Sequence, residues 1–137
     1  MNALFLTHLG ATWGLVGLIW TIQVVHYPLF ALVGREAFPV YHRRHTRSIT
    51  WIVAPLMAVE LISGLVLAIE DRSALLRWSL VLLGFNWLST ACIQIPLHNR
   101  LEKGFEPQAH ARLVLSNWGR TLAWSGRGIL LVLVALR

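Results

Sequence analysis

The chain has 137 residues, of which 56% are hydrophobic and 13% are charged, whereas a soluble domain is usually about a quarter charged. Four apolar segments, roughly residues 9–30, 48–69, 75–97 and 113–136, each exceed the ~20 helical residues that cross a bilayer. This composition excludes an ordinary soluble domain and predicts an all-α fold: one integral membrane domain of four transmembrane helices that occupies residues 1–137.

The net charge of +6 does not indicate nucleic acid as a partner. Most of the Arg and Lys residues flank the predicted membrane segments, where they set orientation and contact lipid headgroups. The single cysteine, Cys92, excludes an intramolecular disulfide and a cysteine-based metal cluster. We therefore expect membrane lipids, and no nucleic acid, around this chain.

Polar residues close the first apolar segment and fill the connector after it. Gln23 and His26 are three residues apart and so share a helix face, either toward headgroups or toward an internal site. His42 and His45 have the same spacing, which would suit a shared metal ion if other ligands joined them. The alternative for this connector is a basic collar that faces lipid headgroups.

Glu60 lies far from either end of the second apolar segment. Ionisable residues at such a depth are costly and usually face the bundle interior. Helical rise places Glu60 about 20 Å, Asn86 about 18 Å and Arg127 about 10 Å in from the cytoplasmic end, so Glu60 and Asn86, with Arg127 as a further candidate, could form a second, deeper polar cluster. Glu60 would be either an acid neutralised by a structural partner or a buried acid that moves protons.

The distribution of basic residues predicts the orientation. Both long connectors are rich in Arg and Lys, whereas the opposite side carries Arg72, Arg77 and Arg137. The positive-inside rule therefore predicts that both connectors are cytoplasmic and that both termini lie on the non-cytoplasmic side.

The two halves of the chain resemble each other. Residues 47–51 read RSITW and residues 120–124 read RTLAW, while residues 22–26, IQVVH, resemble residues 93–98, IQIPLH. A two-helix unit repeated in one orientation implies a pseudo-two-fold axis along the membrane normal. The repeat predicts a polar pocket at the cytoplasmic end, formed by Gln23, His26, Arg47, Gln94, His98, Asn117 and Arg120, with His42 and His45 nearby.

Two motifs of the second half, PLHNRL at residues 96–101 and NWGRT at residues 117–121, resemble the small four-helix membrane proteins of the anthrone oxygenase-like family. The resemblance implies oxidation of a flat, apolar phenolic substrate by O2. It also implies that His98, Asn117 and Arg120 are site residues.

Three functions are compatible with this pattern. In the first, the chain is a membrane oxidoreductase in which His98 or His26 removes a proton and Arg120 or Arg47 holds an oxyanion. Asn117 completes that catalytic set, and the substrate would be bound by Gln23, Gln94, Trp51 and Trp124.

In the second function, His26 and His98 are axial ligands of a haem, or the two bind a transition metal together with His42 and His45. In the third, the chain is a non-catalytic small membrane subunit or a lipid-binding protein whose arginines hold lipid headgroups. The partners to expect are membrane lipids, a small hydrophobic substrate, and either further copies of the chain or a larger membrane complex. The sequence leaves the cofactor open: none, a haem and a transition metal all remain compatible with it.

Overall fold

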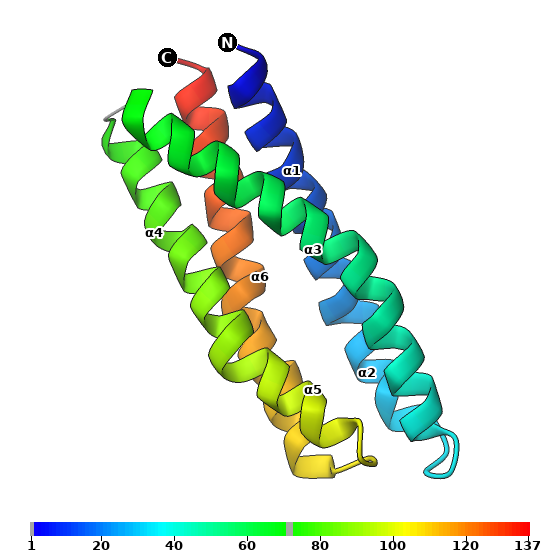
Figure 1. Cartoon of the computed structure of the whole chain (residues 1–137). Coiled ribbons are helices and arrows are strands. Elements are labelled where there is room, and N and C mark those ends of the chain that lie inside the picture. The colour runs from blue at the N-terminus through cyan, green and yellow to red at the C-terminus, as the bar shows by residue number, and fades with distance from the viewer. Residues whose placement is uncertain (1, 71–72) are drawn as a thin grey trace.

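The computed structural model describes residues 2–70 and 73–137, and the regular structure within them is helical. Four helical rods run alternately in opposite directions, so that both termini lie at one end of the bundle and both connectors at the other (Figure 1). The predicted all-helical bundle of four helices is confirmed. Arg72, which contributed to the predicted orientation, lies outside the described residues.

Two of the rods are interrupted and two are continuous. The first rod consists of α1 (Ala3–Thr21), the π-helical turn η1 (Ile22–His26), α2 (Tyr27–Leu29) and the 3-10 turn η2 (Phe30–Leu32). The second is α3 (Phe38–Glu70). The third consists of α4 (Ala74–Ser89), the π-helical turn η3 (Thr90–Gln94) and α5 (Ile95–Leu101), and the fourth is α6 (Pro107–Ala135).

The second and fourth helices begin earlier than predicted. The apolar pattern placed their starts at residues 48 and 113, whereas α3 begins at Phe38 and α6 at Pro107. Basic side chains do not end a helix, because they extend into water beyond the apolar span while the backbone bonds continue. The chain reverses instead at short segments, the second of which contains Gly104 with a φ of 154° that favours glycine.

Each π-helical turn is separated from a proline by one residue. Pro28 and Pro96 are the second residues after η1 and η3. Proline has no N–H, so the helix around it cannot keep its regular hydrogen-bond pattern, and the wider turn absorbs the disturbance. π-helical turns occur often at functional sites. Here η1 directly precedes Tyr27, and η3 ends one helical turn before His98.

Helix α6 is the central element of the bundle. It packs along α1 and α4, while α1 also packs along α3, and α3 and α4 contact each other much less (Figure 1). Within the described residues, three rods are long and apolar enough to cross a membrane: Ala3–Leu32, Phe38–Glu70 and Ala74–Leu101. Helix α6 differs because it buries several polar side chains, among them Asn117, Arg120 and Arg127.

Gly64 lies where three rods meet, and we expect Gly64→Ala to destabilise the fold. An added Cβ would lie 2.9 Å from Cε1 of His8 and 3.2 Å from Cδ2 of Leu80. Overpacking of this kind costs about 1–3 kcal/mol. The purified protein should therefore unfold at a lower temperature. Gly84→Ala is the matched control, because nothing lies within 4 Å of a Cβ at that position; an equal loss in both variants would contradict the prediction.

Candidate functional site

A buried hydrogen-bonded network lies at the connector end of the bundle. The side-chain amide of Asn117 donates to Oε1 of Gln23 at 2.8 Å, and Nη1 of Arg120 donates to Oδ1 of Asn117 at 3.0 Å. Gln23 itself donates to the carbonyl oxygen of Val114 at 3.2 Å. The structure thus brings together three of the predicted site residues, from α6 and from η1.

A chain of three aromatic side chains continues from this network. The guanidinium of Arg120 lies beside Tyr27. The Tyr27 hydroxyl is 2.9 Å from Nε2 of His98, and Nδ1 of His98 is 3.0 Å from Nε2 of His42. Each contact joins a group that can donate to one that can accept, so one proton can be passed along the chain in either direction.

Arg120 is a buried cation without a carboxylate partner. Its side chain is 5% exposed, and its polar neighbours are an amide oxygen and a phenol. None of the ion pairs among the described residues includes it, and its Nε has no hydrogen-bond partner in that part of the chain. Burying an uncompensated charge costs several kcal/mol, on the order of the cost of breaking a buried ion pair.

The void next to Arg120 is small. It measures about 10 Å³ and is lined mainly by apolar side chains of α1, with Val53 from α3 and Trp124 from α6. This volume is no larger than the space for one water molecule, about 10–15 Å³. In this arrangement apolar side chains therefore pack where the sequence predicted an open pocket.

Two members of the predicted deeper cluster lie together and form an ion pair. Arg127 and Glu60 form a salt bridge in which both side chains are fully buried. Glu60 also accepts hydrogen bonds from Thr12 at 2.9 Å and from Nε1 of Trp124 at 3.2 Å. Arg127 lies 3.1 Å from Nε2 of His8. Glu60 is thus a neutralised and fully hydrogen-bonded acid in this structure.

Asn86, which helical rise placed at the same depth, is buried but makes no side-chain hydrogen bond among the described residues. It is therefore not part of the network that surrounds Glu60.

Trp124 separates the two polar regions. Its indole nitrogen bonds to Glu60, and Cζ of Arg120 lies 4.9 Å from the centre of its ring. The cation–π contact offsets part of the cost of burying Arg120. Trp124 therefore lines the void beside Arg120, and its contact with a substrate stays a prediction.

Four predicted residues lie apart from the network. Arg47 and Trp51 are exposed on α3, and the ring of His26 packs against that of His45, with 5.4 Å between centres, beside a surface hollow. Gln94 is buried and donates to the Ser116 hydroxyl at 3.0 Å.

The four histidines proposed as metal or haem ligands form two pairs, His26 with His45 and His42 with His98. Both ring nitrogens of His98 are engaged by Tyr27 and His42, so neither is free to bind an iron. Among the described residues, no group of three or more His, Cys, Asp and Glu side chains is placed to hold a metal ion.

The sequence reasoning missed Tyr27 and His8. Tyr27 precedes a proline, a position that indicates a helix end, yet it is 3% exposed and joins Arg120 to His98. His8 stands at the edge of the apolar segment, but α1 begins at Ala3, so His8 lies inside the helix and faces Ser63 and Arg127. A search for every polar side chain within an apolar helix would have found both.

Comparison of the chain with models of known protein families, with curated proteins and with solved structures finds no match. The resemblance of residues 96–101 and 117–121 to the anthrone oxygenase-like family therefore stays a prediction, and the function has to be argued from the site itself.

Proposed function

We propose that this chain is a membrane oxidoreductase that oxidises a small, lipid-soluble substrate with O2 at the connector end of the bundle. The substrate class is an aromatic ketone or phenol with an acidic methylene group that is conjugated through the ring with the oxygen atom. Its methylene group loses two hydrogens and gains one oxygen atom of O2, while the other oxygen atom leaves as water.

The observation that carries this proposal is the buried, unpaired cation Arg120. Ionisable side chains inside membrane bundles are costly, and they mark functional sites by default. A guanidinium without a carboxylate partner can bind an anionic group of a substrate. An enolate or phenolate oxygen supplies that charge when the substrate loses its proton, and Arg120 would stabilise it.

The neighbouring side chains supply a route for that proton. Tyr27 lies beside Arg120 and is hydrogen-bonded to His98. We assign Tyr27 as the group that takes the proton from the substrate while its own proton passes to His98. His42 is next in the chain, and its buried Nδ1 has no hydrogen-bond partner among the described residues. His98 thus acts as the base through Tyr27 rather than by direct contact.

Access for the substrate requires side chains to move. The void beside Arg120 holds about 10 Å³, so a flat aromatic molecule has to displace the apolar side chains of α1 and Val53 of α3. Helix α3 packs mainly against α1 and contacts α4 little, so the boundary between α3 and α4 is the one best able to open. A substrate dissolved in lipid would reach Arg120 between α3 and α4.

We also propose that α6 crosses the membrane as a fourth span and that the connector end is cytoplasmic, as the positive-inside rule predicts. The inward-facing Asn117, Arg120 and Arg127 account for the lower hydropathy of α6. The proposed duplication of the two hairpins is supported by the π-helical turn that precedes a proline in the first rod of each, at Pro28 and Pro96.

The assignment of Tyr27 is tested with a matched pair of variants, because the chain has two tyrosines. Purified protein in liposomes is given anthrone, a flat ketone with an acidic methylene, and O2 uptake is followed. Tyr27→Phe should lower the turnover by about 10²–10⁴-fold, the usual contribution of a proton-transfer group. Tyr41→Phe changes a partly exposed tyrosine and should leave the turnover unchanged.

The two contrary outcomes are distinct. No O2 uptake by the wild-type protein with anthrone or related phenolic ketones would exclude the proposed substrate class and favour a non-catalytic role. Equal turnover of wild type and Tyr27→Phe would remove Tyr27, and with it the His98 relay, from the mechanism.

A further inference from the structure

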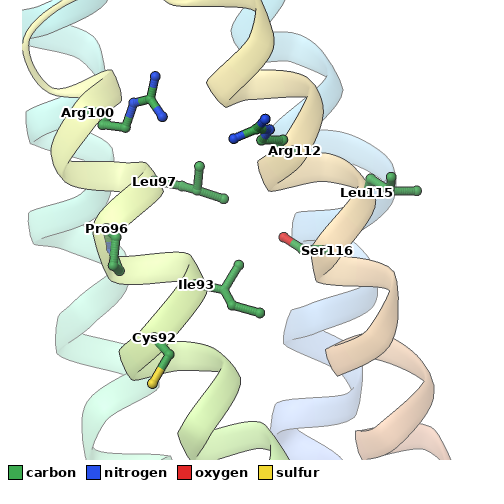
Figure 2. Close-up of a pocket in the computed structure, with 8 residues that line it drawn as sticks. All are labelled: Cys92, Ile93, Pro96, Leu97, Arg100, Arg112, Leu115 and Ser116. Atoms are coloured by element: carbon green, nitrogen blue, oxygen red, sulfur yellow. The ribbon is translucent and has the colours of Figure 1, made fainter.

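A groove separate from the network runs along the outer surface between α6 and the rod formed by η3 and α5. It has a volume of about 420 Å³, and Cys92, Ile93, Leu97 and Leu115 form apolar parts of its walls. Figure 2 shows that Leu97 and Ile93 extend from one wall toward α6, which forms the other. Such a shape suits an extended hydrocarbon chain that lies along the helices.

The groove has a positively charged end. Arg100 from α5 and Arg112 from α6 lie on its opposite walls, at the end farthest from Cys92 (Figure 2). Arg112 has no ion-pair or hydrogen-bond partner within residues 2–70 and 73–137. Arg100 is held by the Glu106 carboxylate through Nε and Nη2, and its Nη1 has no hydrogen-bond partner in the described part of the chain. Two guanidiniums and one carboxylate give this end a net positive charge.

The positions of these groups match the layers of a membrane. Arg100 is 26 residues after Ala74, about 39 Å along the rod, which places it beyond a hydrocarbon core of about 30 Å. Cys92 is eight residues before Arg100, about 12 Å deeper along the helix. The charged end of the groove therefore lies at headgroup level, and its apolar part at acyl-chain level.

We propose that this groove is a binding site for an anionic phospholipid. The phosphate lies between Arg112 and Arg100, since guanidinium groups bind phosphate oxygens in a bidentate manner. One acyl chain lies along Ile93, Leu97 and Leu115. A free phosphate would leave the apolar part of the groove empty, and a neutral lipid would leave Arg112 without a counter-charge. The site is independent of the proposed oxidation, because Arg112 and Ile93 take no part in the network around Arg120.

The test is lipid retention by the purified protein in detergent, measured by native mass spectrometry after incubation with equal amounts of phosphatidylglycerol and phosphatidylcholine. The wild type should retain phosphatidylglycerol several-fold more than phosphatidylcholine. Arg112→Gln should lower phosphatidylglycerol retention about five-fold, the effect of one basic side chain near a charged lipid. Arg35→Gln is the control, because Arg35 is an exposed arginine at the same end of the bundle, in the other connector.

A second variant tests the apolar part without changing the charge. Ile93→Trp places a larger side chain in the groove and should lower retention of phosphatidylglycerol, while glycerol 3-phosphate, which has no acyl chain, should not compete with the lipid. Unfolding temperatures of the variants show that the fold is intact. Equal retention of the two lipids by the wild type, or equal losses in Arg112→Gln and Arg35→Gln, would overturn the proposal.

Discussion

Replacement of Glu60 by glutamine is expected to lower the free energy of unfolding by about 3–5 kcal/mol, the usual effect of removing one partner of a buried ion pair. The reason is that Arg127 would remain fully buried beside a neutral amide. His8 and Ser79, the other neighbours of Arg127, offer hydrogen bonds but no negative charge. The loss therefore reflects the uncompensated charge of Arg127 more than the hydrogen bonds of Glu60.

The measurement is unfolding of the purified protein in mixed micelles with increasing SDS. The double variant Glu60→Leu/Arg127→Leu should recover most of the loss, because it removes both charges and leaves apolar side chains in an apolar interior. Glu102→Gln is the control: Glu102 pairs with Arg43 at the surface, where such a pair contributes about 0–1 kcal/mol. Similar losses in Glu60→Gln and Glu102→Gln would show that burial does not determine the effect.

The number and order of the helices follow from hydropathy alone, but their lengths and ends do not. Apolar periodicity shows where a helix is buried in lipid, and it carries no information on how far the helix extends into water. The basic residues that surround His42 were therefore assigned to a connector, although they form the first turns of α3. That extension is what allows His42 to contact His98.

The candidate site was predicted in part, and the errors have one physical cause. The predicted repeat places Arg47 and Trp51 in positions equivalent to Arg120 and Trp124. Helix α6, however, packs against two rods along its length, whereas α3 packs mainly against α1. Side chains at equivalent positions are therefore buried against other helices on α6 and exposed on α3. The sequence contains the similarity of the two halves but not the packing order that makes their environments unequal.

Replacement of Arg120 by leucine is expected to lower turnover by at least about 10²-fold and to leave the stability almost unchanged. Without the guanidinium, the developing oxyanion of the substrate loses its counter-charge, and loss of one such donor lowers the rate by about 10²–10³-fold or more. The protein loses one hydrogen bond to Asn117 and a cation–π contact with Trp124. The substitution also removes the free-energy cost of burying an unpaired charge, on the order of several kcal/mol. This gain in stability offsets the loss of the two contacts.

Arg127 provides the matched comparison, since it is a second buried arginine on the same helix, seven residues further along. Arg127→Leu leaves Glu60 as an unpaired buried acid, so it should lower the free energy of unfolding by about 3–5 kcal/mol. Unfolding in SDS and O2 uptake with anthrone, both measured on the two variants, separate the roles of the two residues. An Arg120→Leu protein that unfolds as easily as Arg127→Leu and still turns over substrate would make Arg120 a structural residue. An Arg120→Leu protein that is as stable as the wild type but has lost its turnover would show that Arg120 acts in function. Removal of a structural cation would instead lower the free energy of unfolding.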